Sequence, residues 1–266
     1  MGPPCYIVHQ RRGPATKCAI SPSAVLLVAL FTVSPLELAS GYAVSALAAL
    51  GGGGALSLQV RTLLASSGLH TDPYYSVVTW HALLMIFGFV MPLLFGVVAN
   101  GTLTGQVGLS DLLLPRLNAA GLWLLADAVV LMLLTQAVAA PTGWTLYPPL
   151  AALEAVGVDY SVIALHVAGV SSLALAVNLL ATTYCAYQAR LQWRAVPLVW
   201  WATAVANVLL VLTLPALAAA ITMLLLDRRA NTSYYSVDAA GEPVLYQHLF
   251  WFFGCAQQHV AAAPSW

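Results

Sequence analysis

The sequence predicts an all-α polytopic transmembrane helix bundle of about six spans, the last one short. Hydrophobic residues make up 61% of the 266 residues and charged residues only 7%. The mean hydropathy of +0.87 lies far above that of soluble proteins. The formal charge is zero, with no basic stripe to neutralise phosphates, so a lipid bilayer is the expected surrounding and a nucleic-acid partner is not.

Six apolar segments are expected to form the spans, because an apolar run of about 20 residues crosses the hydrocarbon core as a helix. The first contains the glycine run 51–54, which in a bilayer allows close approach of another backbone or of a flat ligand. The segments cover about residues 41–60, 74–100, 117–140, 158–187, 196–226 and 243–254. Around this membrane part, 41–254, we expect a basic N-terminal extension, 1–40, and a divergent C-terminal tail, 255–266.

The N-terminal extension is basic at its start, with Arg11, Arg12 and Lys17 and no acid up to about Pro22. This composition is typical of a membrane-flanking tail or of the remnant of a targeting segment. The apolar stretch 24–33 that follows is too short to cross alone. It is a signal h-region, an interfacial segment or a lead-in to the first span.

The loop cations predict the orientation of the bundle. Besides the N-terminal extension, the loops expected on the same side hold Arg116, Arg190 and Arg194. The opposite side has Arg228 and Arg229, with Arg61 near its membrane edge. By the positive-inside rule, the N-terminus faces the negative compartment, a matrix or a cytoplasm.

His81 is an imidazole several residues inside the second span, where an ionisable group needs a partner. It is either hydrogen-bonded to a neighbouring helix or a metal ligand, and neutral imidazole is a common ligand of heme iron. The residues alone give these two interpretations nearly equal weight.

Polar residues before and within two other spans indicate either packing or a proton path. Asp111, Asn100 and Asn118 are expected at one membrane face, as a solvated loop with capping side chains or as the mouth of a path that collects protons. In the fourth span, hydroxyl and amide groups either bond neighbouring helices or continue a chain of waters. These residues are Ser171, Ser172 and Asn178.

Three further ionisable residues lie at or near membrane depth. His166 and His248 are expected to be hydrogen-bonded packing residues rather than ligands. Asp127 lies inside the third span, where insertion of an aspartate costs about 2.5–3.5 kcal/mol. We expect it to be protonated or to face a neighbour, and the sequence assigns it no role.

Residues expected at the opposite membrane face have interfacial explanations. Arg61 either extends to the interface, with its aliphatic stem in the apolar layer, or donates to a buried polar group. Taken alone, Trp144 and Tyr147 are typical of an aromatic belt at the membrane interface.

Seven stretches in the same order resemble the N-terminal half of heme-copper oxidase subunit I, the catalytic subunit of cytochrome c oxidase. The resemblance covers about residues 41–254 and implies half of that family's twelve-helix fold. The stretches are His81–Pro92, Pro115–Asn118, Gly143–Leu150, Leu165–Ser172, Leu214–Leu225, Asp227–Thr232 and Leu245–Gly254.

The resemblance implies a heme site. His81 matches the first axial ligand of the low-spin heme A, and Arg61 matches the arginine that bonds the formyl group of that heme. Trp144 and Tyr147 match residues near the heme propionates. Trp251 matches an aromatic residue beside the binuclear centre.

The resemblance also implies a proton path of the type called the D pathway. Its entrance would be formed by Asp111, Asn100 and Asn118. Its lining would be formed by Tyr42, Ser171, Ser172 and Asn178.

The chain departs from the family where copper B should be bound. In the family, Trp-Phe-Phe-Gly is followed by a copper histidine, a proline and a glutamate, whereas this chain has Cys255, Ala256 and Gln257. A serine frequent in the D pathway appears as Gly121, and a Pro-Pro pair appears as Ala126-Asp127. The sequence ends at roughly half the usual length of the family, so we expect a separate chain to carry the remaining half with the high-spin heme and copper B ligands.

Together these features predict the N-terminal fragment of a split cytochrome c oxidase subunit I, not catalytic alone. Its expected partners are the chain with the C-terminal half, the other oxidase subunits and, through the complex, cytochrome c. The expected location is the mitochondrial inner membrane, with a bacterial plasma membrane as the alternative. The rival functions are a fragment of a quinol oxidase subunit I and a non-catalytic structural helix bundle.

Overall fold

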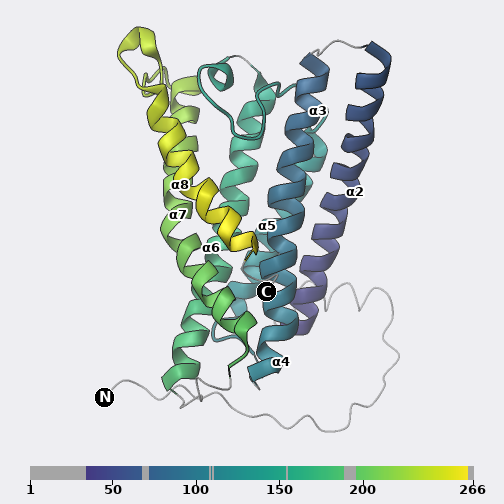
Figure 1. The fold of residues 1–266 in the computed structure, drawn as a ribbon, viewed down its shortest axis with the longest axis vertical. Helices are drawn as coiled ribbons and strands as arrows, with labels where there is room; N and C mark the ends of the chain where they lie inside the picture. The colour runs from purple at the N-terminus through teal and green to yellow at the C-terminus, as the bar shows by residue number, and fades with distance from the viewer. Residues whose placement is uncertain are drawn as a thin grey trace.

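The computed structural model describes residues 34–67, 72–107, 109, 111–153, 155–188 and 196–262. Within these ranges every regular element is helical, and two segments have π-helical hydrogen bonding (Figure 1). The elements are α2 (Pro35–Ser67), α3 (Asp72–Leu83), η1 (Leu84–Val90), η2 (Pro92–Leu103), α4 (Thr104–Val107), α5 (Pro115–Thr135), η3 (Leu150–Ala152), α6 (Val156–Gln188), α7 (Leu198–Arg229), η5 (Val237–Ala239) and α8 (Pro243–Ala262).

Five helical stretches are long and apolar enough to cross a membrane, and the predicted fold class is confirmed. Elements α3, η1, η2 and α4 follow one another as a single span, and α8 is a sixth, shorter helix. Figure 1 shows α8 starting at the upper end of the bundle and running obliquely toward its middle. The five stretches are Pro35–Ala65, Pro73–Gln106, Pro115–Thr135, Val156–Ala186 and Leu198–Arg229.

The helix bounds differ from the predicted spans mainly at polar ends. Helix α2 runs from Pro35 to Ser67 rather than over about 41–60, because a helix continues past the apolar core where its ends carry groups such as Glu37 and Arg61. Helix α5 ends at Thr135 rather than near residue 140. The backbone then turns over residues 136–149, where proline and a left-handed glycine interrupt helical hydrogen bonding.

Close helix contacts depend on small residues. A Cβ atom added at Gly88 of η1 would lie 2.8 Å from the Ala49 Cβ of α2, and one added at Gly52 would lie 2.3 Å from a Leu133 methyl of α5. Such spacing lets helices in a bilayer approach one another and gain packing energy. Helix α5 packs mainly on α6 and α2, and α7 packs on α6 and α8.

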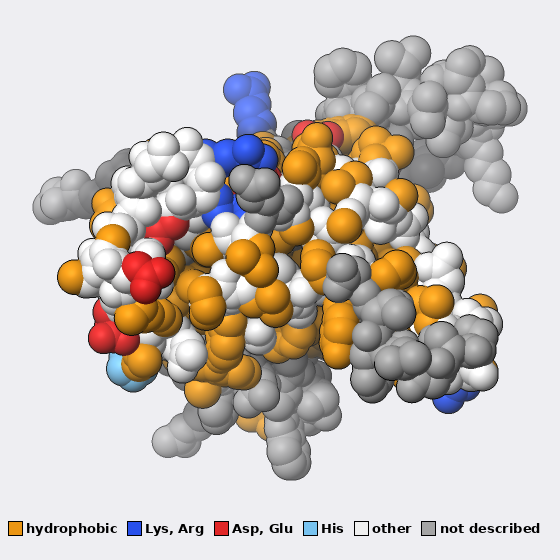
Figure 2. Space-filling view, turned by 90° about the horizontal axis from the view of Figure 1, so that it is seen from above, with side chains coloured by type: hydrophobic (Ala, Val, Ile, Leu, Met, Phe, Trp, Pro, Cys, Tyr) orange, Lys and Arg blue, Asp and Glu red, His pale blue; other side chains and the backbone are white. Residues whose placement is uncertain are grey.

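Apolar side chains also cover the outside of the bundle. Val44, Leu134 and Leu212 are 68%, 75% and 63% exposed. Viewed from the upper end, hydrophobic atoms spread over most of the described surface, and charged atoms form a few small groups (Figure 2). A surface of this kind suits hydrocarbon rather than water.

Candidate functional site

The site is built on α3, which holds the turn region that follows α5. The indole of Trp80, fully buried, donates to a carbonyl of this region at 3.0 Å. The hydroxyls of Ser76 and Thr79 accept backbone amides at 3.1 and 2.8 Å. One face of α3 therefore fixes the backbone that leads into Trp144, through Val138, Ala140 and Gly143.

His81 lies half-buried on the same helix, next to Trp80, with its Nδ1 atom 2.8 Å from the carbonyl oxygen of Gly53 in α2. Because a carbonyl oxygen only accepts, Nδ1 carries the proton and the lone pair of a neutral ring is on Nε2. A Cβ added at Gly53 would lie 2.9 Å from the Met85 sulfur, so glycine allows this close approach of α2. An imidazole oriented in this way by a backbone carbonyl is the usual state of a metal-ligating histidine.

Trp144, Tyr147 and Trp251 gather in one aromatic cluster between the turn region and α8. The Trp251 indole donates to the Tyr147 hydroxyl. The Trp144 ring lies edge-to-face with Phe250 at 5.4 Å and with Trp251 at 6.4 Å. The hydroxyl of Tyr246, also on α8, donates to the Thr145 carbonyl at 2.9 Å. Trp144 and Tyr147 are thus partly buried against α8.

A ring contact joins α8 to the span that carries His81. Phe87, six residues after His81, stacks on Phe253 of α8 at 6.2 Å with an interplanar angle of 14°. The elements that carry His81 and the aromatic cluster are thus packed together. Arg61 is exposed near the end of α2.

At the other end of the bundle, two buried amides form a direct link. The Asn118 amide of α5 donates to the Asn100 side-chain oxygen of η2. Asn100 in turn donates to the carbonyl of Gly96 at 2.8 Å. The Asn118 side-chain oxygen is buried and has no hydrogen-bond partner among the described residues. A buried acceptor without a protein partner is a favourable position for a water.

The segment with Asp111 is held by α6. The Asn178 side chain accepts from the amide of Leu114 at 2.9 Å and donates to the carbonyl of Leu114 at 3.1 Å. The Thr182 hydroxyl accepts from the amide of Leu113 at 2.9 Å. The carboxylate of Asp111 accepts from the Leu112 amide at 2.7 Å. Partial burial raises the pKa of Asp111 above its ordinary value, and the Leu112 hydrogen bond offsets part of this rise. Asp111 is therefore a carboxyl group that holds its proton more tightly than a free aspartate.

Tyr42, Ser171 and Ser172 line one small cavity between α2, η2 and α6. Its volume is about 20 Å³, enough for one water. The Tyr42 hydroxyl is buried and has no hydrogen-bond partner within the described structure. The Ser171 hydroxyl donates to the carbonyl of Gly121 at 2.6 Å. The structure thus brings the seven expected polar residues together in three groups, the amide pair, the Asp111 segment and this cavity.

The remaining ionisable residues behave differently from one another. Both ring nitrogens of His166 lie within hydrogen-bond distance, at 2.8 Å from the Val162 carbonyl and 2.9 Å from the Thr222 hydroxyl of α7, as expected for a packing residue. His248 is exposed on α8. Asp127 is exposed on α5, and its carboxyl group makes no hydrogen bond or ion pair in the described part of the chain.

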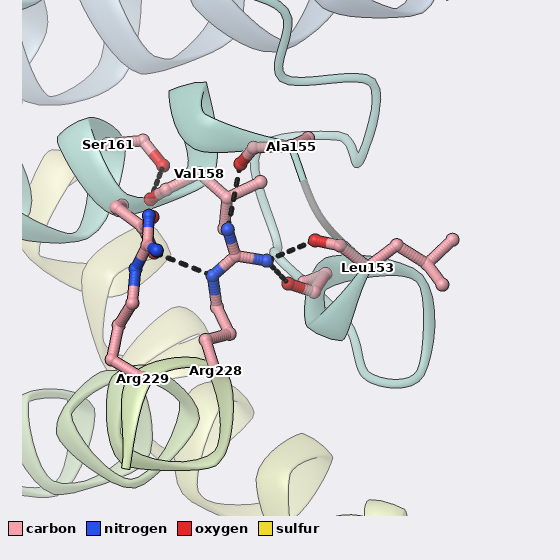
Figure 3. Close-up of polar contacts among 8 residues, drawn as sticks. Leu153, Ala155, Val158, Ser161, Arg228 and Arg229 are labelled. Atoms are coloured by element: carbon pink, nitrogen blue, oxygen red, sulfur yellow. Dashed lines mark hydrogen bonds and ion pairs between the residues drawn. The ribbon is translucent and has the colours of Figure 1, made fainter. Parts of the chain in front are cut away.

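An arginine clamp at the upper end of the bundle was not predicted from the sequence. Arg228 of α7, nearly fully buried, pairs with Asp159 of α6 at 2.7 Å. Figure 3 shows its guanidinium group pointing into the segment before α6, where it donates to three backbone carbonyls. An arginine in a charged loop gives no sequence signal for such contacts, because the carbonyls belong to Ala151, Leu153 and Ala155, more than 70 residues earlier.

The fold and this geometry define a class of protein, a polytopic bundle of helices long and apolar enough to cross a membrane. It carries a half-buried imidazole bonded to a backbone carbonyl, and a set of buried polar groups near one end. Within the described ranges, no group of three or more His, Cys, Asp or Glu residues is placed to hold a metal ion.

Comparison with known proteins identifies the family. The family model described as "Cytochrome C and Quinol oxidase polypeptide I" matches residues 37–265, so the chain belongs to this family. Cytochrome c oxidase subunit 1 of Pecten maximus is 38% identical over 223 residues, which are 80% of this chain and 47% of that protein. The same subunit of Candida albicans is 38% identical over 84% of this chain and 43% of its own length. That of Eremothecium gossypii is 35% identical over 80% of this chain and 42% of its own length. The chain thus spans about half the length of the curated relatives it matches.

Proposed function

We propose that this chain serves as the N-terminal half of a D-pathway cytochrome c oxidase subunit I, in which His81 binds the iron of a low-spin heme A. The observation that carries the proposal is the Nδ1 hydrogen bond to the Gly53 carbonyl, 2.8 Å long, which leaves the lone pair of Nε2 for a metal. The family membership gives this geometry its chemical context.

The residues around His81 would bind and orient the group. Arg61 would donate to the formyl substituent, and Trp144 and Tyr147 would lie near the propionates. Trp251 would lie beside the oxygen-reducing centre, and its hydrogen bond to Tyr147 would stiffen this side of the pocket. When bound, the low-spin heme would supply a one-electron carrier between the electron donor and that centre.

Replacement of His81 tests the heme assignment. His81→Ala is expected to abolish the absorbance band of the low-spin heme in the purified complex, because no axial imidazole remains on this side. The matched control is His166→Ala, which removes an imidazole already engaged with α6 and α7. An unchanged low-spin band in the His81 variant would refute the assignment.

The proton path is proposed to start at Asp111. Its raised pKa favours proton capture, the Asn118 oxygen offers an unfilled acceptor, and the cavity at Tyr42 has room for a water. Asp111→Asn is expected to slow turnover or to lower the number of protons pumped per electron. Asp238→Asn, an exposed acid at the other end of the bundle, is the control and should leave both unchanged. Wild-type turnover and pumping in the Asp111 variant would remove it from the path.

The copper part of the active centre is not proposed for this chain. Cys255 stands where the family has the copper histidine, and Gln257 stands where it has the glutamate. The chain therefore lacks the copper imidazole, and the glutamine amide has no titratable proton to replace the carboxyl group. We propose that a separate chain of the oxidase complex provides the copper B ligands, the high-spin heme ligand and the second low-spin ligand. Mass spectrometry of all chains in the native complex tests this. The histidines should appear on a separate polypeptide, and their presence on a longer form of this chain would contradict the proposal.

The electron donor is proposed to be cytochrome c and the location the mitochondrial inner membrane. The matched relatives are cytochrome c oxidase subunits, whereas the family description also names quinol oxidases. Oxidation of reduced cytochrome c by the purified complex would support the first function, and oxidation of quinol alone would support the second. A complex without any heme band would leave the non-catalytic helix bundle.

A further inference from the structure

The outer face of α5 carries one carboxylate among apolar side chains. Asp127 is exposed there, and so are Trp123 (40%), Val130 (52%) and Leu134 (75%). In the described part of the chain, no cation or hydrogen-bond donor pairs with Asp127. An ionisable residue facing out of a membrane bundle without a partner is unfavourable unless something outside the chain provides one.

The depth of Asp127 excludes the lipid head groups as that partner. It follows the helix start, Pro115, by twelve residues and precedes the helix end, Thr135, by eight. At about 1.5 Å per residue, it lies about 18 Å from one end and about 12 Å from the other. The aspartate side chain is too short to cover either distance, so its partner must lie within the apolar layer.

The spacing of the exposed residues points to another helix. Ala120, Trp123, Asp127, Val130 and Leu134 follow one another in steps of three and four residues, and all five are exposed. Such a repeat of about 3.5 residues forms a straight seam against which a second helix packs at a small crossing angle. We call these five residues the α5 seam. The opposite side of α5 packs on α6 and α2, so the seam faces away from the bundle.

We propose that the α5 seam binds a transmembrane helix of another polypeptide that places a lysine or arginine opposite Asp127. Charge complementarity selects this partner, because a buried carboxylate in a bilayer is stabilised most by a cation that also donates hydrogen bonds. A second copy of this chain does not fit. Packed through the same seam, it would bring another Asp127 or apolar side chains, since the seam itself contains no cation.

Photo-crosslinking in the native membrane tests the proposal. A photoreactive phenylalanine analogue replaces Val130 in the seam, and in a second strain it replaces Ile163 on the outer face of α6, which is 45% exposed, as a positional control. The expected product at Val130 is a single peptide whose apolar segment contains a lysine or arginine. Adding Asp127→Leu should lower the Val130 yield about three- to tenfold. Adding Asp127→Glu should preserve the yield, and the Ile163 products should not respond to either change.

Three results would overturn the proposal. One is a Val130 product that contains only lipid or a second copy of this chain. Another is a partner helix without a basic residue in its apolar segment. The third is a Val130 yield that Asp127→Leu leaves unchanged. Where a partner is identified, exchanging charges, with Asp127→Lys in this chain and an acid at the partner's basic position, should restore the yield. Failure of the exchange with both proteins present would also refute the ion pair.

Discussion

At the scale of single residues, Gly121 shows how closely the polar cavity is packed. A Cβ atom there would lie 2.9 Å from the Tyr42 hydroxyl, and the Tyr42 ring is confined on its other side by Gly96, where a Cβ would lie 2.3 Å from a ring carbon. The serine that the resemblance leads one to expect at this position therefore has no room while Tyr42 keeps its place. The departure at Gly121 and the position of Tyr42 are consistent with each other.

Gly121→Ala is expected to lower the free energy of unfolding by about 1–3 kcal/mol, because the added methyl overpacks the cavity. Gly169→Ala, on α6, is the matched control, since its Cβ would meet nothing within 4 Å. There the change should be neutral or stabilising, by at most about 1 kcal/mol. Thermal unfolding of both variants in the same detergent measures the difference, and equal effects would contradict the packing argument.

Asp111 gives a prediction about pH. Its pKa is raised above the ordinary value of 3.8 by burial, so the folded chain binds this proton more tightly than the unfolded chain. The resulting stabilisation is fully present below pH 3.8 and is lost as pH rises through the raised pKa. Relative to Asp111→Asn, the free energy of unfolding of the wild-type chain should therefore fall as the pH rises from 3.8 through the raised pKa of Asp111. Chemical denaturation of both proteins at a series of pH values checks the sign, and a wild-type advantage that grows with pH would contradict it.

Single residues also mark the limit of prediction from sequence. The cost of an imidazole in a bilayer drew attention to His81, but its partner, the Gly53 carbonyl, is a backbone atom 28 residues away and has no sequence signature. The roles of Ser76, Thr79 and Thr182 were missed for the same reason, since each accepts a backbone amide from a segment more than 60 residues away. The chemistry of a residue can be inferred from its type and depth, whereas its partner requires the fold.

At the scale of elements, the spans were predictable because apolar length has a direct physical meaning in a bilayer. Their ends were less so. The apolar composition of residues 136–140 suggested that the third span continued, but Thr135 ends α5 and the next residues turn back toward α3. The anchors from α3 stabilise this turn, and no local feature of residues 136–140 predicts them.

The arginine clamp joins α7 to the start of α6, and its two arginines are expected to contribute unequally. Arg228→Met removes a buried partner of Asp159 and the guanidinium hydrogen bonds to three carbonyls (Figure 3). The Leu153 and Ala155 carbonyls still accept a backbone amide after this change. Breaking one side of a buried pair typically lowers the free energy of unfolding by about 3–5 kcal/mol. Arg229, whose side chain is 59% exposed, also contacts Asp159, but Arg229→Met should lower it by only about 0–1 kcal/mol.

Thermal unfolding of the two variants in parallel measures this difference. Amide exchange over residues 150–155 should rise in Arg228→Met and stay near the wild-type rate in Arg229→Met, because only Arg228 binds the backbone of that segment. Equal losses in both variants would mean that the exposed charge, rather than the backbone contacts, stabilises the junction.

At the scale of the whole molecule, the two polar regions lie at different ends of the same bundle. The Asp111 segment and the amide pair lie near the junction of α4 and α5, whereas the aromatic cluster and the arginine clamp lie near the start of α8 (Figure 1). The proposed proton path begins at one of these ends and the proposed heme pocket lies nearer the other, so the proposed function requires a defined orientation in the membrane. The loop cations are its expected physical cause.

The structure sharpens the charge argument, because Arg228 is buried against Asp159 and cannot reach lipid head groups. In the folded protein, the exposed cations at the Arg228 end are then mainly Arg61 and Arg229. At the Asp111 end Arg116 is exposed, and the sequence segments expected on that side also contain Arg190 and Arg194. We therefore expect the Asp111 end to face the negative compartment.

Cysteine labelling in sealed vesicles of known sidedness tests this orientation. Single cysteines are introduced at Arg116 and at Asp238, both exposed and at opposite ends of the bundle, in a chain whose native cysteines are replaced by serine. A membrane-impermeant thiol reagent added on the positive side should label the Asp238→Cys variant and spare Arg116→Cys until the vesicles are opened. The reverse pattern would place Asp111 on the positive side. A proton taken up there would move in the wrong direction for the proposed pump, which draws protons from the negative compartment.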